Sequence, residues 1–232
     1  MKRVILKLSG EALSAGSGDI YDSSFVNEVA AAIKSCSDEG YEIAIVVGAG
    51  NIWRGRQGTD MDRTAADRMG MLATVINSIY LKDALERAGA RARVMTAVAM
   101  APFAQHYSAE EADRALQSGE IVIFGAGLGI PFLSTDTAGA VRASEIDADA
   151  MLMAKNIDYI YTADPKLDPK AKKLEKIKAS EILAMNLKAI DATATAFCMS
   201  VGMPIRVFGL KSGEDIVRAI HGDKCGTEVI AE

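Results

Sequence analysis

The stretch that decides the fold is Ile43-Ala44-Ile45-Val46-Val47-Gly48-Ala49-Gly50-Asn51, in which an apolar run ends directly in a glycine-rich turn. The same arrangement recurs at 4–10 and at 121–129. A short run that is apolar throughout is typical of a strand buried on both faces of a parallel sheet. Helix signals lie between these strands. The alternation predicts an α/β protein, a three-layer αβα sandwich with a mostly parallel central sheet.

The remaining elements are predicted from apolar runs and helix caps. Asp22 and Ser108 are expected N-caps, and Ser108-Ala109-Glu110-Glu111 is a capping box. Strands are expected at 4–8, 43–47, 92–96, 121–124, 151–154, 159–162, 205–208 and 227–230, and helices over 23–39, 65–88, from 109, from 135, over 179–185, over 193–199 and from 212. With no linker, repeat or low-complexity segment, we expect one domain over 1–232.

Composition restricts the class of partner. Half of the 232 residues are hydrophobic, and 26 basic against 31 acidic residues give a net charge of −5. No global basic field of the nucleic-acid-binding kind exists. The three cysteines are scattered, so we expect reduced thiols and neither a disulfide framework nor a zinc site. Lys7 and Glu11 interrupt the apolar start, and no apolar run spans a bilayer. We expect a cytoplasmic protein without nucleic-acid or membrane partners.

Lys7 places a charge on an otherwise apolar strand. Strand alternation puts it on the same face as Ile5 and Ser9, just before Gly10. A buried ammonium needs an anion, because burying it unpaired is costly. The alternative is an edge-strand lysine that reaches water. Gly10 and the small residues after it favour contact with a phosphate.

The second glycine-rich loop, 48–51, allows a ligand to approach the backbone closely. It is followed by Trp53-Arg54-Gly55, and a guanidinium suits bidentate phosphate binding. A plain turn between strand and helix is the alternative. Asp67 lies further on, inside the expected long helix. It could hydrogen-bond a ribose hydroxyl, or it could be a solvated helix carboxylate.

The third loop runs from Gly125 to Asp136. Its G-x-G-x-G spacing differs from the dinucleotide fingerprint G-x-G-x-x-G, and Pro131 prevents an immediate helix. Ser134-Thr135-Asp136 at the later helix start is better explained as hydroxyls and amides that face an anion. Asp136 could orient Lys7 or a Mg²⁺-bound phosphate, and it could also be a simple N-cap.

Several common catalytic motifs are absent from the sequence. There is no Walker A loop, no protein-kinase H-R-D or D-F-G, and no nucleophile elbow. Neither His106 nor His221 has an obvious serine or cysteine partner, so both are predicted to be surface residues.

Taken together, six motifs closely resemble the bacterial UMP kinases, which have the amino-acid kinase fold. The resemblance runs from Lys2 to Thr227 and extends to Pro204-Ile205-Arg206-Val207-Phe208. The motifs lie at 7–13, 48–55, 69–74, 131–136, 161–165 and 191–194.

The resemblance implies reversible transfer of the γ-phosphoryl group of Mg-ATP to UMP, giving UDP for pyrimidine nucleotide biosynthesis. Mg²⁺ would arrive with ATP, without a protein metal site. The implied catalytic residues are Lys7, Asp136 and Asp191, with the two carboxylates together organising Lys7 and the Mg²⁺ that comes with ATP. The implied ATP contacts are Lys7, Leu8, Ser9, Gly10, Gly50, Arg54, Asn156 (or Lys155 in its place), Tyr161 and Asp164. The implied UMP contacts are Ala49, Asp67, Leu128, Gly129, Ile130, Pro131, Phe132, Leu133, Ser134 and Thr135.

Such family members are homohexamers, commonly activated by GTP and inhibited by UTP, which makes the long helix from Ala65 a candidate subunit contact. A helix face of this kind is more often ordinary core. Two departures stand out. Ala49 replaces a glycine of the usual Gly-Gly-Gly-Asn, and Leu128 and Ile130 stand where some members carry polar residues.

Three alternatives remain beside this interpretation. The chain could be another kinase of the same fold that acts on acetylglutamate, aspartate or carbamate, although Arg54 with Asp67 suits a nucleotide better. It could be a non-catalytic nucleotide-binding or storage protein, but Lys7, Asp136 and Asp164 are all present. An NAD-binding module is disfavoured by the glycine spacing.

Overall fold

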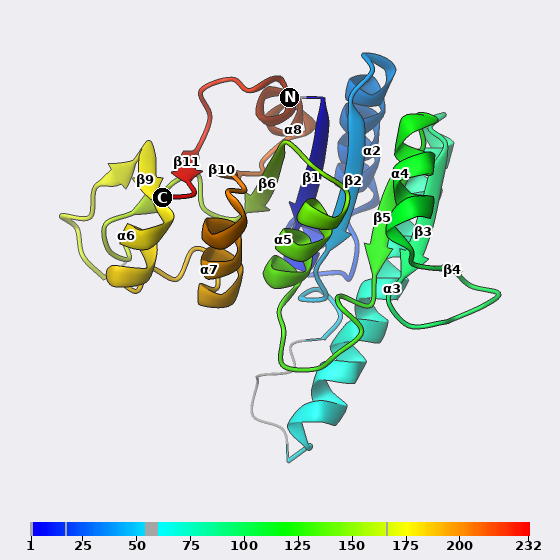
Figure 1. Cartoon of the computed structure of the whole chain (residues 1–232), viewed down its shortest axis with the longest axis horizontal. Coiled ribbons are helices and arrows are strands. Elements are labelled where there is room, and N and C mark those ends of the chain that lie inside the picture. Colours follow the sequence, from blue (N-terminus) through cyan, green and yellow to red (C-terminus); the bar gives the residue numbers. More distant parts are fainter. Residues whose placement is uncertain (1, 17, 54–59, 166) are drawn as a thin grey trace.

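The computed structural model describes residues 2–16, 18–53, 60–165 and 167–232. A nine-stranded sheet runs through it in the order β4-β3-β5-β2-β1-β6-β10-β11-β9 (Figure 1). Its strands are β1 (Arg3–Leu8), β2 (Glu42–Val47), β3 (Ala92–Thr96), β4 (Gln105–His106), β5 (Ile121–Gly125), β6 (Ala150–Lys155), β9 (Lys176–Lys178), β10 (Ile205–Gly209) and β11 (Thr227–Ile230). Neighbouring strands are parallel except β10 and β11, so the predicted mostly parallel sheet is confirmed.

The strand predicted at 159–162 lies outside this sheet. Its paired part is β7 (Ile160–Tyr161), which forms a two-stranded antiparallel sheet with β8 (Lys173–Leu174). The sequence patterns did not predict β4, β8 or β9. Each spans two or three residues, and such short strands carry almost no periodic signal.

The helices begin at polar or charged caps, two of which were predicted from the sequence. Asp22 and Ser108 accept the capping hydrogen bonds as predicted. The cap of α5 is Ser134, whose side chain accepts from the amides of Asp136 and Thr137, so the reading of Asp136 as a simple N-cap is wrong. The helices are α1 (Gly10–Ser14), α2 (Ser23–Asp38), α3 (Arg63–Arg87), α4 (Ala109–Gln117), α5 (Thr135–Glu145), α6 (Ala179–Ala184), α7 (Ala192–Val201) and α8 (Gly213–His221).

Strand alternation divides the apolar side chains into two cores, one on each face of the sheet. Ile5 and Met151 face α4, α5 and α7, whereas Leu6 and Ile45 face α2, α3 and α8. This is the predicted three-layer arrangement. No helix in the described part of the chain is both long enough and apolar enough to cross a membrane. His106 and His221 are exposed, as predicted, and all three cysteines are free thiols.

The glycine-rich turns after β1 and β2 pack backbone against backbone. A Cβ on Gly10 would lie 2.4 Å from the Gly50 nitrogen, and a Cβ on Gly48 would lie 3.0 Å from the Gly10 nitrogen. The first distance is shorter than real Cβ contacts, so glycine is required at Gly10. The second is tighter than most real Cβ contacts, so a side chain at Gly48 would require the neighbouring backbone to shift. The two turns and the loop after β5 leave the same edge of the parallel sheet, and the first half of α3 extends beyond that edge (Figure 1).

Candidate active site

Two lysines from neighbouring parallel strands share one carboxylate at this edge. Lys7 of β1 places its Nζ 2.7 Å from Asp136 Oδ1, and Lys155 of β6 places its Nζ 2.7 Å from Asp136 Oδ2. Lys7 pairs in register with Met153, so Lys155, two residues further along β6, points to the same face. We call these three side chains the Lys7–Asp136–Lys155 cluster. Two positive charges and one negative charge favour an anionic ligand.

Lys7 and Asp136 are buried, and Lys155 is half-buried. Lys7 is 5% exposed and Asp136 is 8% exposed. The alternative of an edge-strand lysine is therefore wrong, because β1 lies inside the sheet between β2 and β6. The sequence indicates Lys155 only as an alternative to Asn156. It has the same sequence signal as Lys7, a lysine near the end of an apolar strand, so the pattern could have revealed it.

Burial and charge act in opposite directions on the cluster. Burial alone would raise the pKa of Asp136, but the charges and hydrogen bonds of Lys7 and Lys155 outweigh it and hold that pKa below its usual value. Burial, followed by the charge of Lys7, lowers the pKa of Lys155, which Asp136 and Asp191 only partly restore. Asp136 is therefore ionised at neutral pH, and Lys155 holds its proton less tightly than an exposed lysine does.

Asp191 joins two helices. It caps α7 by accepting the Ala194 amide at 2.8 Å, and it accepts hydrogen bonds from the Ser134 hydroxyl and, at 3.2 Å, from Thr137 Oγ1 on α5. No ion pair between Asp191 and Lys7 is found among the described residues. Of the two predicted catalytic carboxylates, only Asp136 is found in contact with Lys7 in the described part of the chain. Asp191 instead holds the start of α5, the helix that carries Asp136.

The cluster opens into a charged cavity of about 650 Å³. Arg63 and Asp67 come from α3, and Asp191 and Lys188 come from the segment before α7. The mixture of lysine, arginine and carboxylate side chains is polar and suits phosphate groups. We call it the charged cavity.

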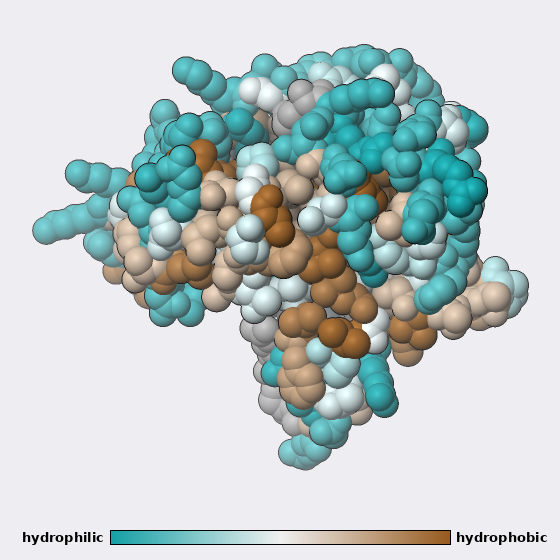
Figure 2. All heavy atoms as spheres, in the orientation of Figure 1, coloured by the Kyte–Doolittle hydropathy of each residue, from teal (hydrophilic) through white to brown (hydrophobic). Residues whose placement is uncertain are grey.

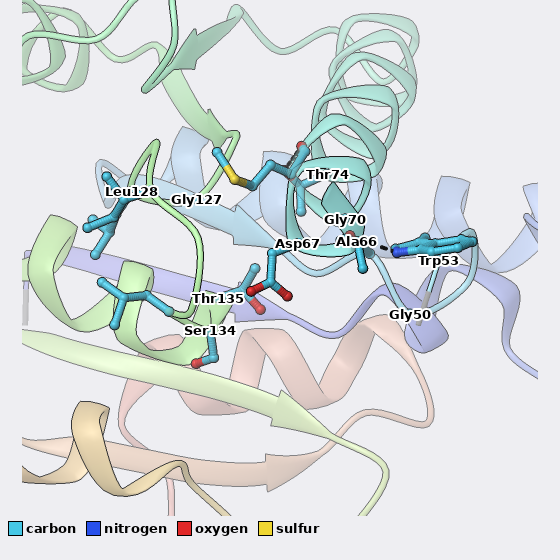
Figure 3. Close-up of a pocket in the computed structure, with 14 residues that line it drawn as sticks. Gly50, Trp53, Ala66, Asp67, Gly70, Thr74, Gly127, Leu128, Ser134 and Thr135 are labelled. Atoms are coloured by element: carbon cyan, nitrogen blue, oxygen red, sulfur yellow. Dashed lines mark hydrogen bonds between the residues drawn. The ribbon is translucent and has the colours of Figure 1, made fainter. Parts of the chain in front are cut away.

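A second cavity of about 380 Å³ adjoins the charged cavity and is more apolar (Figure 3). Asp67, Leu133 and Ser134 line both cavities. The Trp53 indole forms part of the wall and is held by a 2.9 Å hydrogen bond from its Nε1 to the Ala66 carbonyl. We call it the apolar cavity, and its lining is Ala49, Gly50, Trp53, Ala66, Asp67, Gly70, Met71, Thr74, Gly127, Leu128, Ile130, Leu133, Ser134 and Thr135.

The loop after β5 forms one side of the apolar cavity and carries apolar side chains to the surface. Figure 2 shows apolar side chains gathered in this region, and Ile130, Phe132 and Leu133 are exposed there. The Ala126 amide donates to Thr74 Oγ1 at 2.9 Å, which ties the loop to α3. Asp67 makes a second tie by accepting the Phe132 amide at 2.9 Å. Asp67 is therefore not merely a solvated helix carboxylate.

A third cavity, of about 560 Å³, lies beside α1 and the ends of β6 and β10. Its lining includes Asn156, whose amide nitrogen donates to Glu11 Oε2 at 2.9 Å, and Lys211. Lys155 and Asn156 therefore face different spaces. Lys155 lines the charged cavity and Asn156 lines this third one, which we call the α1 cavity.

The family model for the amino acid kinase family matches residues 2–209. The chain belongs to the amino acid kinase family. This excludes the alternative of an NAD-binding module and agrees with the predicted fold.

Solved structures of UMP kinases are similar over the whole chain. The UMP kinase of Bacillus anthracis matches with a TM-score of 0.95 and 35% identity, covering 100% of this chain and 96% of that one. The UMP kinase of Ureaplasma parvum matches with a TM-score of 0.92 and 36% identity, covering 99% and 98%. A uridylate kinase of Archaeoglobus fulgidus matches with a TM-score of 0.76 and 27% identity, covering 99% and 100%. The predicted amino-acid kinase fold is confirmed.

The structure brings the residues expected to bind UMP together better than those expected to bind ATP. Most of the expected UMP residues line the apolar cavity, Phe132 lines the charged cavity, and Gly129 and Pro131 connect the lining positions. Leu8 points into the core on the α2 face, so it can offer only its backbone. The Ser9 side chain caps α1 through the Ala12 amide at 3.2 Å.

The expected contacts to the ATP nucleoside are spread out. Tyr161 donates its hydroxyl to Asp158 at 3.0 Å, and the Asp164 carbonyl accepts the amides of Leu167 and Asp168. Neither Tyr161 nor Asp164 belongs to the described lining of the three cavities. Arg54 lies outside the described residues.

The carboxylates do not form a cage for a metal ion. Within the described residues, no three His, Cys, Asp or Glu side chains gather closely enough to hold one. Both Asp136 oxygens already bind lysines, and the Asp191 oxygens bind two hydroxyls and an amide. This donor set does not fit a protein-held Mg²⁺, because Mg²⁺ requires oxygen ligands in a nearly ideal octahedron.

Proposed function

We propose that this chain is a UMP kinase that phosphorylates UMP to UDP with ATP in pyrimidine nucleotide biosynthesis. The observation that carries the proposal is the adjacency of the two cavities. The buried Lys7–Asp136–Lys155 cluster faces the charged cavity, and that cavity meets the apolar one at Asp67, Leu133 and Ser134. The full-length likeness to solved UMP kinases supports UMP as the acceptor.

The reaction is a direct transfer. An oxygen of the UMP phosphate attacks the γ-phosphorus of ATP, the bond to the β,γ-bridging oxygen breaks, and ADP leaves. Lys7 and Lys155 bind the oxygens of the transferred group, where charge develops, and Asp136 holds both lysines in position. Phosphoryl transfer depends mainly on positioning and charge neutralisation, so no covalent enzyme intermediate is required.

The acceptor binds with its base in the apolar cavity. The uracil lies among Trp53, Leu128 and Ile130, and mainly backbone groups recognise it. Asp67 accepts a hydrogen bond from a ribose hydroxyl. Ser134 and Thr135, at the start of α5, direct the UMP phosphate toward the charged cavity, because the amides of a helix N-terminus favour an anion.

The donor binds along the turns after β1 and β2. Ser9, Gly10 and Gly50 lie along its phosphates, with Arg54 as a further cation. Asn156, in the α1 cavity, contacts the nucleoside end, and Tyr161 and Asp164 complete that side. Mg²⁺ comes with the ATP phosphates and is not held by a protein cage.

One assay tests the proposal. Purified protein is given Mg-ATP with UMP, CMP, dUMP and acetylglutamate in parallel, and ADP formation is measured. We expect rapid turnover with UMP and little with the others. Equal turnover of CMP would disprove the specificity, and turnover of acetylglutamate alone would favour a different kinase of this family. No ADP with any acceptor would favour a nucleotide-binding protein without catalysis.

We also propose that the chain works as a homohexamer in the cytoplasm, regulated by GTP and UTP. The support for assembly is α3, whose side chains Met69, Leu72, Ile76 and Ile79 are 40–53% exposed in the single chain. The alternative of an ordinary core face is therefore wrong for these four residues. GTP and UTP remain predictions from the family resemblance.

A further inference from the structure

Arg63 binds Asp67, but the proposed reaction gives Arg63 no role. Its Nε donates to both oxygens of Asp67, at 3.0 Å to Oδ1 and 2.9 Å to Oδ2. Its guanidinium also lies 5.2 Å from the centre of the Phe132 ring. Arg63 therefore contacts both Asp67 and Phe132. Asp67 in turn accepts a hydrogen bond from the Phe132 backbone amide. These three residues join the start of α3 to the loop after β5.

Helix stability does not explain an arginine at this position. Arg63 is the first residue of α3, where the positive end of the helix dipole disfavours a cation. A basic residue four positions before an acidic one is also the less favourable order for such a pair. The same helix shows the favourable arrangement at its other end, where Asp83 precedes Arg87 and the two side chains lie 2.8 Å apart.

Asp67 keeps capacity for a ligand while Arg63 holds it. Its Oδ2 accepts from both Phe132 and Arg63, whereas Oδ1 accepts from Arg63 alone among the described residues. A carboxylate oxygen can accept two hydrogen bonds, so Oδ1 has room for one more donor. The side chain is 19% exposed and lines both cavities. Figure 3 shows it among the residues of the apolar cavity.

We propose that Arg63 is a positioning residue that acts through Asp67 to select the ribose hydroxyl of the acceptor nucleotide. This inference rests on the proposed UMP kinase function. The guanidinium fixes the rotation of the carboxylate, so that Oδ1 meets the hydroxyl in one geometry. Without Arg63, the Phe132 amide alone would orient Asp67, and the carboxylate could turn about its side-chain bonds.

The test measures kcat/KM for UMP, 2′-deoxy-UMP and 3′-deoxy-UMP in wild type, Arg63→Ala, Asp67→Asn and the double variant. We expect wild type to prefer UMP over at least one deoxy analogue by more than about tenfold, because a hydroxyl bound to a charged group contributes that much. Arg63→Ala should reduce the preference to within about threefold. The double variant should be no worse than either single variant, because both changes remove the same interaction.

Two further variants separate positioning from a structural role. Arg87→Ala breaks the other Arg–Asp pair of α3 and should leave the preference unchanged. Arg63→Lys keeps the charge but loses the planar Nε donor, so its preference should fall between those of wild type and Arg63→Ala.

The outcomes distinguish the inference from the function on which it rests. Wild-type protein that makes no UDP from UMP would disprove the proposed function. Active wild type that treats UMP and both deoxy analogues alike would overturn the inference. It would also be overturned if Arg63→Ala slowed all three acceptors equally, which would indicate a direct phosphate contact or a general structural role.

Discussion

At the residue scale, Asp136 connects Lys7 and Lys155, the two lysines that line the charged cavity. Each of its oxygens binds one lysine at 2.7 Å, and the carboxylate is almost fully buried. Removing one partner of a buried ion pair commonly costs about 3–5 kcal/mol, because the remaining charge loses its compensation. Here a second lysine remains bound to Asp136 when either lysine is removed, so each can be replaced with a smaller loss of stability.

Replacing Lys7 tests its part in the transition state. We expect Lys7→Ala to lower kcat by about 10²–10³-fold, because it removes a cation that neutralises developing charge. The fold should survive, since Lys155 still pairs with Asp136. Steady-state kinetics and circular dichroism check both points. The control is Lys176→Ala, which breaks an exposed ion pair to Glu228 on the far edge of the sheet. Near-normal turnover of Lys7→Ala would contradict the assigned role.

The lowered pKa of Lys155 predicts a pH dependence. Activity that needs the charged lysine should fall as pH rises through this pKa, which lies below 10.5. Stability should change in the opposite direction. Between the lowered pKa and 10.5, Lys155 binds fewer protons in the folded state than in the unfolded state. The free energy of unfolding therefore increases as pH rises through that window. Activity lost without unfolding would identify deprotonation as the cause.

The matched variant for this pH dependence is Lys155→Arg. Arginine stays charged throughout the accessible range, so the alkaline fall in kcat should move to higher pH. The measurement is kcat against pH from 7 to about 10.5, with unfolding followed in the same buffers. An alkaline limb that does not move would assign it to another group.

At the element scale, Asp191 holds α5 and α7 in a fixed relation. It caps its own helix and binds hydroxyls at the start of the neighbouring helix, which carries Asp136. Asp136, the proposed catalytic carboxylate, is therefore positioned by a second carboxylate, Asp191, for which no ion pair with Lys7 is found among the described residues. This refines the prediction that Asp136 and Asp191 act together on the lysine.

Replacing Asp191 should affect both stability and turnover. We expect Asp191→Ala to lower the free energy of unfolding by about 2–3 kcal/mol, since it removes an N-cap and hydrogen bonds to a charged group. Asp191→Asn keeps the cap and should cost less. Chemical denaturation and kcat measure the two effects. Asp22→Ala, which removes the cap of α2 alone, should cost about 1 kcal/mol and leave kcat unchanged. Equal losses in Asp191→Ala and Asp22→Ala would rule out the link between the helices.

At the scale of the whole molecule, α3 has apolar side chains that remain exposed in the single chain. Met69, Leu72, Ile76 and Ile79 recur at intervals of three and four residues, so they lie along one side of the helix. An exposed apolar stripe is typical of a protein–protein interface. The same helix supplies Asp67 to the apolar cavity, so the proposed subunit contact and the proposed UMP site share one element.

A charge on this stripe should change the oligomeric state. We expect Leu72→Glu to shift the protein to smaller species in sedimentation velocity, because a carboxylate buried in an apolar contact would be unpaired. The control is Val201→Glu, since Val201 is similarly exposed at 45% but lies on α7. An unchanged sedimentation profile for Leu72→Glu, or the same shift for Val201→Glu, would exclude the stripe as the contact.

Local patterns in the sequence determined most elements of this protein. The strands at 92–96 and 227–230 have the predicted bounds, and Asp22 and Ser108 are the predicted caps. These features depend on neighbours within a few residues, so periodicity and capping chemistry suffice to predict them. Lys7 was identified for the same reason, as a charge in an apolar strand. The prediction of one domain stays a prediction.

Tertiary structure alone decided which side chains meet. Lys155 joins Lys7 because β6 pairs with β1 across more than a hundred residues, and Asp136 reaches both because α5 crosses that pair. Arg63, Asp67 and Phe132 converge only when the loop after β5 reaches α3. Only the tertiary structure shows, in the same way, that Lys155 and Asn156 line different cavities. Strand order and helix crossing set these contacts, and both depend on packing between segments that are distant in the chain.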